Sequence, residues 1–287
     1  MPEESFTPSS AAIRLTHWLD ALAAIGQPRF PVDVEQLALG VGRQLKWADP
    51  ITVVNAADIQ NFEGGLFHLG DQGWALLYNV KLKSPGRVRF TQAHELGHYL
   101  LHRLAQKEFR CSQSDMIHWG PEQKSIEAQA DDFASNLLMP MKQFRVATRA
   151  DVVDFEVLST ASTMFGVSLT AIALRWIRST SESALLILSR DGFIDWAVSS
   201  DKARSNGAFF KTKGHVVPLP SATLASDERI SACRTGQCVP LMSWFHHAHP
   251  DASALEMKLT CENYGYTLSL LHLSPGDKVW EPRQWGQ

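Results

Sequence analysis

Cysteine is scarce in this sequence, with four residues in a chain of 287. Small secreted domains held together by disulfides need a much denser framework, so that class of protein is excluded. No stretch approaches the roughly 18 uninterrupted apolar residues that a membrane helix requires. The first residues also lack a basic region followed by an apolar core. We therefore expect a cytoplasmic protein without a membrane span, whose thiols are buried, metal-binding or reactive.

A strong charge of either sign is missing as well. The formal net charge is −3, so any binding to nucleic acid or anionic lipid must come from a local patch. Hydrophobic residues make up 45% of the chain and charged residues 20%, which is typical of a globular protein. The length allows one large domain or two modest ones.

The most informative motif is His94-Glu95-Leu96-Gly97-His98. Residues i and i+4 of a helix share a face, so His94 and His98 can bind one Zn²⁺ with Glu95 held beside the open position. Zinc lowers the pKa of bound water from about 16 to about 7, and Glu95 could take the proton during attack on a carbonyl. The alternative is an amphipathic helix with two solvated histidines. The apolar neighbours argue against it, because they predict a helix buried on most sides.

A catalytic zinc site normally has a third protein ligand, and residues 121–138 offer one. The pattern predicts a helix that Pro121 opens and Pro140 ends. Glu127 lies among small residues of this helix, where its carboxylate could complete the metal site. Asp131 lies one turn further on and could hold a ligand histidine in the correct tautomer. Either acid could instead lie on a solvated helix face.

Residues 103–120 connect these two helices and are too polar for a core element. We expect them to pass over or beside the cleft. A thiolate is a better zinc ligand than water, so Cys111 could be a removable fourth ligand that silences the enzyme. A packed or exposed cysteine is the alternative. His118 could stabilise an oxyanion, or it could be an ordinary loop histidine.

Together these motifs resemble those of the ImmA/IrrE-type metallopeptidases. The resemblance covers roughly residues 32–177 and rests on Arg89–His98, Glu127–Ala134 and Leu137–Pro140. It implies a zincin-like helical domain in which His94, His98 and Glu127 bind one Zn²⁺ per chain and Glu95 is the base. It also implies an intracellular protease that cuts a helix-turn-helix repressor. Such cleavage would switch on a stress, DNA-damage, anti-phage or mobile-element programme.

The residues before the motif predict two helices and a small antiparallel sheet. Helical spacing runs over residues 9–25, and Asp33 is positioned to cap a second helix that ends near residues 40–42. From residue 51 the period changes to two. The predicted strands are 51–54, 66–68 and 74–80, with turns at 64–65, 71–73 and 84–86. Either of the last two strands could hold a substrate by strand addition.

The residues after the motif predict a helix pair and then a strand-rich domain. The pair spans about residues 152–179 with Gly166 at its turn and resembles a helix-turn-helix, but its few polar side chains favour packing over DNA recognition. A polar break predicts a metallopeptidase domain at residues 1–180 and a second domain at 181–287. Strands are expected at 184–188, 193–199, 239–245, 254–261 and 266–273. The resemblance implies that the second domain is a GAF-like α/β sensor, which makes the chain α+β overall.

A cationic and aromatic stretch lies within residues 201–215. Its members are Lys202, Arg204, Phe209, Phe210, Lys211 and Lys213. Cations can contact phosphates while aromatic rings stack on bases, so single-stranded DNA or a nucleotide could bind here and activate the protease. The alternative is a solvated hairpin whose aromatic side chains turn toward the core.

Two functions of other classes also fit the sequence. In a DNA-binding regulator the zinc would be structural, and Glu95→Gln would leave function intact. A constitutive zinc amidohydrolase would instead process short peptides and leave a folded repressor uncut.

Overall fold

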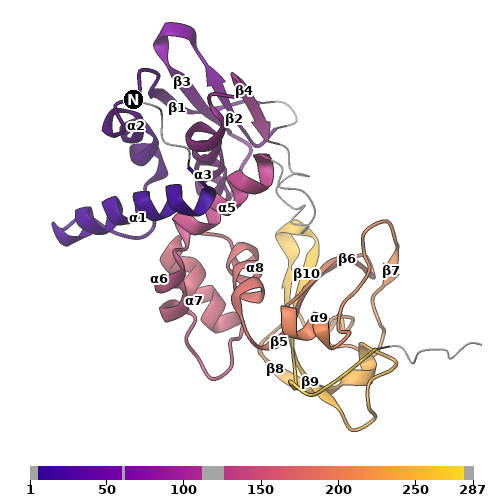
Figure 1. The fold of residues 1–287 in the computed structure, drawn as a ribbon. Coiled ribbons are helices and arrows are strands. Elements are labelled where there is room, and N and C mark those ends of the chain that lie inside the picture. Colours follow the sequence, from indigo (N-terminus) through magenta and orange to yellow (C-terminus); the bar gives the residue numbers. More distant parts are fainter. Residues whose placement is uncertain (1–5, 60–61, 112–125, 281–287) are drawn as a thin grey trace, which may run out of the picture. The chain divides into compact units, whose positions relative to one another are not determined.

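In the computed structural model of the protein, residues 6–59, 62–111 and 126–280 are described. These residues form eight α-helices and two β-sheets, which establishes the expected α+β class (Figure 1). The chain groups into two compact units. The first holds residues 1–147 and 161–168, and the second holds residues 148–160 and 169–287. The domain boundary expected at residue 180 stays a prediction.

The helices of the first unit agree in part with the sequence pattern, which did not predict α6. They are α1 (Pro8–Ala24), α2 (Val34–Gln44), α3 (Pro85–His102), α5 (Ile126–Leu138) and α6 (Met141–Ala147), while α7 (Phe155–Phe165) belongs partly to each unit. As predicted, the Asp33 side chain accepts a hydrogen bond from the backbone N–H of Gln36 and caps α2. The turn expected at residues 84–86 is instead the start of α3, because Pro85 at the first helical position needs no N–H partner.

The sheet of the first unit is mixed, whereas the sequence predicted an antiparallel one. Its strands are β1 (Ile51–Ala57), β2 (Gly64–His68), β3 (Trp74–Asn79) and β4 (Glu108–Cys111), in the order β1-β3-β2-β4. Strand β1 pairs with β3 in parallel, and β2 pairs with the other side of β3 in antiparallel. Both β2 and β3 are therefore interior strands, so the strand addition expected there is ruled out. The outer strands are β1 and β4, and β4 was not predicted.

Gly64 and Gly97 of the first unit allow close approach between elements. Gly64 belongs to β2 together with Gly65, and the two do not form the expected turn. A Cβ atom at Gly64 would lie 2.4 Å from the Thr91 side chain and 2.9 Å from Oε1 of Glu95. Gly97 brings α3 against α5, since a Cβ atom there would lie 3.0 Å from the Phe133 ring and 3.1 Å from the Ala130 backbone. The missing side chains of Gly64 and Gly97 thus allow β2 and α5 to lie close to α3.

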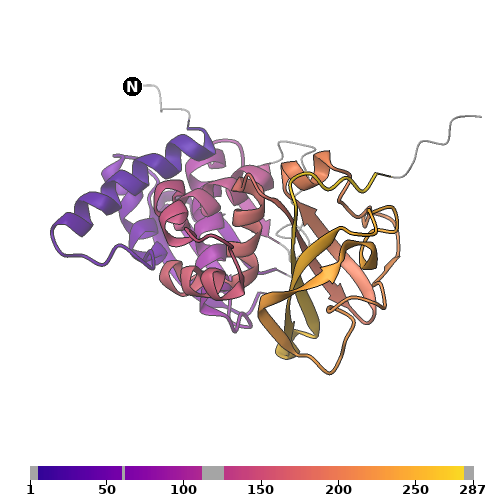
Figure 2. The same ribbon diagram turned by 90° about the horizontal axis from the view of Figure 1, so that it is seen from below.

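The second unit contains a six-stranded antiparallel sheet (Figure 2). Its order is β7-β6-β5-β10-β9-β8, with bounds β5 (Ser183–Arg190), β6 (Phe193–Ser199), β7 (Val217–Pro218), β8 (Ala232–Pro240), β9 (Ser253–Cys261) and β10 (Tyr266–Leu273). Helix α8 (Leu169–Ser179) and the short helix α9 (Asp201–Ser205) complete the unit. The prediction of a strand at 239–245 was wrong beyond Pro240, where β8 ends. The chain there forms a 3₁₀ turn, because Leu241, Trp244 and Phe245 reach the core together at helical spacing.

The helix pair α7–α8 turns at Gly166, whose φ of +63° suits glycine. Helix α8 buries Ile172, Ala173, Trp176 and Ile177, in keeping with a packing role. In the described part of the chain, no single helix is long and apolar enough to cross a membrane. The α7–α8 pair meets that test only as a combined segment, with a bend of 112° between its helices.

The contact between α3 and α5 gives a testable prediction. Gly97→Leu should lower the free energy of unfolding by about 1–3 kcal/mol, because the new side chain overpacks the interface between the helices. Gly40 in α2 is the matched control, since a Cβ atom there would have no described neighbour within 4 Å. Gly40→Leu should be neutral or stabilising by up to about 1 kcal/mol through helix propensity. Urea unfolding of both variants measures this, and equal destabilisation would contradict the packing role of Gly97.

Candidate metal centre

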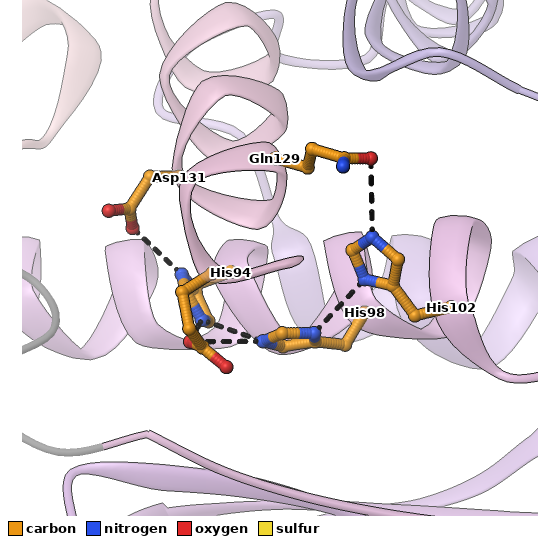
Figure 3. A network of polar contacts seen from close by, with 6 residues as sticks. His94, His98, His102, Gln129 and Asp131 are labelled. Carbon is orange, nitrogen blue, oxygen red and sulfur yellow. Dashed lines mark hydrogen bonds and ion pairs between the residues drawn. The ribbon is translucent and has the colours of Figure 1, made fainter. Parts of the chain in front are cut away.

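Helix α3 carries the three polar residues of the motif into the interior of the first unit. His94, Glu95 and His98 are each 0% exposed. The helix can bury them because its other residues over this stretch are largely apolar, and α5 packs directly against it. Glu127, in the first turn of α5, reaches the two imidazoles from the opposite helix. The network around these histidines is drawn in Figure 3.

Three ligand atoms form a tight triangle. Nε2 of His94 lies 2.9 Å from Nε2 of His98 and 3.1 Å from Oε2 of Glu127, and Nε2 of His98 lies 3.4 Å from the same oxygen. Bonds of about 2.0–2.1 Å to a tetrahedral ion place ligand atoms roughly 3.3 Å apart. Within the described residues, this is the group of histidine, cysteine and acidic side chains with the spacing of a metal site. The structure thus brings together the three ligands expected from the sequence.

Asp131 orients one of these histidines. Its Oδ1 lies 2.8 Å from Nδ1 of His94 (Figure 3). A carboxylate accepts hydrogen bonds, so this contact places the His94 proton on Nδ1 and directs the Nε2 lone pair into the triangle. Burial raises the pKa of Asp131, and the hydrogen bond from His94 opposes that shift. Asp131 therefore occupies the position expected for it.

The ionisation of the triangle suits a cation. Burial lowers the pKa of His98 to about 4, against the hydrogen bond with Glu127, so its imidazole is neutral at pH 7. Burial alone would raise the pKa of Glu127, but its contacts with His94 and His98 lower it overall. A neutral imidazole at His98 and a carboxylate at Glu127 are ligand forms that a divalent metal requires. The residues present therefore fit a metal ion.

Glu95 and the neighbouring strands define the surroundings of the triangle. The Glu95 carboxylate lies beside the backbone of Gly64, because β2 carries no side chain there. From β4, the Phe109 ring stacks on His98 with centroids 4.5 Å apart and an interplanar angle of 20°. This aromatic wall adds to the desolvation that keeps His98 neutral.

The side chain of one predicted site residue, and the whole of another, lie outside the part of the chain that the structure describes. The backbone of Cys111 ends β4, but its side chain is not among the described atoms, and residues 112–125 include His118. The inhibitory role of Cys111 and the oxyanion role of His118 stay predictions.

The cationic and aromatic stretch is divided between surface and core. Helix α9 covers positions 201–205, and the whole stretch joins β6 to β7, which pair antiparallel. Phe210 stacks on Phe245 at 5.1 Å and packs against the core of the second unit, so its ring faces are engaged within the protein. Phe209 meets Trp280 edge-on at 5.9 Å. The remaining members, Lys202, Arg204, Lys211 and Lys213, are exposed.

Three residues next to the triangle were not predicted from the sequence. His102 follows His98 by four residues, and its Nδ1 lies 3.1 Å from Nδ1 of His98. Gln129 on α5 contacts His102 in turn, and Phe109 comes from the unexpected strand β4. The repeated four-residue spacing of His94, His98 and His102 was the available signal for His102. Burial lowers the pKa of His102, partly offset by its hydrogen bond with Gln129.

Comparisons with known proteins give a family match and a similar fold. Residues 49–176 match the model of peptidase family M78, described as an IrrE N-terminal-like domain. A solved structure of a Mycobacterium tuberculosis transcriptional regulator is similar, with a TM-score of 0.52 and 16% identity over 93% of this chain and 75% of that one. At this identity the similarity shows the fold alone. The chain matches none of the curated proteins. The family match covers α3 and α5 with both histidines and Glu127, and residues 49–176 therefore form an ImmA/IrrE-type metallopeptidase domain.

Proposed function

We propose that this protein is a zinc-dependent endopeptidase that cleaves a helix-turn-helix transcriptional repressor. The observation that carries the proposal is the triangle of His94, His98 and Glu127, with Glu95 on the same helix turn, inside an ImmA/IrrE-type domain. The donor set favours zinc, because two imidazoles and a carboxylate are ligands of zinc hydrolases that leave one position open. The triangle also supports the zincin-like description of this domain.

Each residue would have a distinct role in peptide hydrolysis. His94, His98 and Glu127 would hold the ion, which when bound polarises a carbonyl and makes water acidic enough to react near pH 7. Glu95 would take the proton of the attacking water and return it to the leaving amine. Asp131 would keep Nε2 of His94 directed at the ion through the 2.8 Å contact. The buried site would strengthen these electrostatic effects by excluding bulk water.

Strand β4 is the proposed place for the substrate backbone. It is an outer strand of the described sheet and pairs with β2, and its Phe109 touches the His98 ring. An extended peptide could add to its outer edge and pass the ion. Hydrogen exchange of the Glu95→Gln variant would test this, since a bound peptide should protect backbone amides of residues 108–111. Unchanged exchange under saturating peptide would remove β4 from the proposal.

Control of the protease is assigned to the second domain. We propose that residues 181–287 form a GAF-like sensor, which the continuous antiparallel sheet supports. Single-stranded DNA or a nucleotide is the proposed activator, and exposed Lys202, Arg204, Lys211 and Lys213 would contact its phosphates. Phe210 is not among the residues proposed to stack on bases, because it packs against the core of the second unit.

Metal content gives the first test of this function. Wild type should hold one zinc per chain, and His98→Ala should lose it because two ligands bind far more weakly than three. Glu95→Gln should keep the metal, since its carboxylate is outside the triangle. His17→Ala is a control because His17 is exposed on α1. Elemental analysis of the purified proteins measures this. Equal zinc in wild type and a His94, His98, Glu127 triple alanine variant would disprove the assignment.

Acid should destabilise the metal-free protein through His98. Its pKa falls from 6.5 to about 4 in the fold, so between these values the unfolded chain binds a proton that the folded chain does not. Stability therefore decreases as the pH is lowered, by about 3 kcal/mol between pH 7 and pH 4 at 1.36 kcal/mol per pKa unit. Urea unfolding across this range, compared with His98→Gln, isolates the effect. Parallel pH curves for the two proteins would contradict it.

Cleavage distinguishes the proposed protease from its two rivals. A helix-turn-helix repressor encoded by a neighbouring gene should be cut by wild type, and Glu95→Gln should reduce the rate by about 10²–10⁴-fold because the base is lost. The assay is electrophoresis of the repressor after incubation, with and without a single-stranded oligonucleotide or a mononucleotide. Unaltered regulation by Glu95→Gln would favour a structural zinc. Hydrolysis of short peptides with an intact repressor would favour an amidohydrolase. Equal activation of wild type and Lys211→Glu, Lys213→Glu would refute the proposed sensor surface.

A further inference from the structure

A chain of polar contacts leads from the metal triangle to a residue on the facing helix. Nδ1 of His98 lies 3.1 Å from Nδ1 of His102, and Nε2 of His102 lies 3.4 Å from Oε1 of Gln129 (Figure 3). Both histidines belong to α3 and Gln129 belongs to α5. His102 is 7% exposed, so bulk water does not compete freely for its nitrogens.

The proton positions along this chain follow from the donors and acceptors. A neutral imidazole has one N–H group and one lone pair. If Nε2 of His98 binds a metal, its Nδ1 must carry the proton and donate to His102. Nδ1 of His102 is then the acceptor, so its proton lies on Nε2. That N–H group points at Oε1 of Gln129, an acceptor, and every member of the chain is satisfied.

The opposite arrangement would be incompatible with metal binding. A proton on Nδ1 of His102 would require the lone pair of His98 on Nδ1, and the His98 proton would then occupy Nε2. An N–H group at that atom would point at Glu127 and His94 and could not bind a metal. The Gln129 oxygen disfavours this arrangement, because it lies 3.4 Å from Nε2 of His102 and accepts a proton carried on that atom.

We propose that His102 and Gln129 are positioning residues that hold His98 in the metal-binding tautomer. The inference rests on the proposed function, because it presumes that His98 binds a metal through Nε2. It assigns to His98 the support that Asp131 gives to His94, with a neutral acceptor in place of a carboxylate. A neutral acceptor is suited to a site in which the half-buried Glu127 already supplies negative charge.

Zinc affinity of two His102 variants tests the proposal. His102→Leu keeps apolar volume but removes the acceptor, and it should weaken zinc binding 10–100-fold, the usual effect of losing such a partner. His102→Asn should stay within about threefold of wild type, because its side-chain oxygen can accept the His98 proton. Gln129→Leu and Gln129→Glu form a second matched pair on α5, of which only the first removes an acceptor. Competition with a chromophoric chelator measures each affinity.

A spectroscopic measurement separates positioning from general stability. In zinc-loaded protein with ¹⁵N-labelled histidine, His98 should show a slowly exchanging Nδ1–H proton and a nitrogen–nitrogen coupling to His102 across the hydrogen bond. His102→Leu should lose both signals, while urea unfolding of the metal-free variants reports any structural damage. A variant that folds less well but keeps wild-type zinc affinity would overturn the proposal, as would absence of the coupling in wild type.

The same experiments distinguish failure of the inference from failure of the proposed function. Wild type without affinity for zinc would remove the metal site and the positioning role together. Tight zinc binding that is insensitive to His102→Leu and Gln129→Leu would remove the positioning role alone. Zinc binding that depends on His102, in a protein that cuts no repressor, would retain the positioning role and reject the proposed substrate.

Discussion

The close packing of α3 against α5 determines the geometry of the candidate site. Two candidate ligands come from one helix and the third comes from the other, so the triangle exists only at a particular separation of the helices. Gly97 permits that separation, because its missing side chain brings the α3 backbone near Ala130 and Phe133. A displacement of about one ångström would separate the ligand atoms beyond the range that a single ion spans.

The electrostatic balance of the site follows from this packing. Burial of ionisable groups is costly unless each group has a partner. His94 has Asp131, His98 has His102, and the carboxylate of Glu127 faces both ligand nitrogens. A neutral His98 beside an ionised Glu127 forms an arrangement to which a divalent cation would add the missing positive charge. Metal affinity and fold stability are therefore coupled through the same few side chains.

Local patterns explain which parts of the fold were predicted. Helical spacing and an N-cap located α1 and α2, and alternating residues located most strands of the second unit, because these signals depend on nearby residues. The same reasoning failed for Gly64-Gly65 and for β4. Glycine favours turns in isolation, but Gly64 is in a strand because Thr91 and Glu95 lie against it. Strand β4 is four residues long, and its pairing with β2 connects segments far apart in the chain.

The candidate ligand set could be read from local spacing, whereas the groups that orient it could not. The four-residue spacing of His94 and His98 requires a shared helix face, and an acid on the next predicted helix supplies the third donor. Folding instead brings together the residues around His98. They are His102 from a later turn of α3, Gln129 from α5 and Phe109 from β4. Strand order in the first sheet likewise depends on folding, since pairing between distant segments is decided by the packing of the whole unit and not by any local pattern.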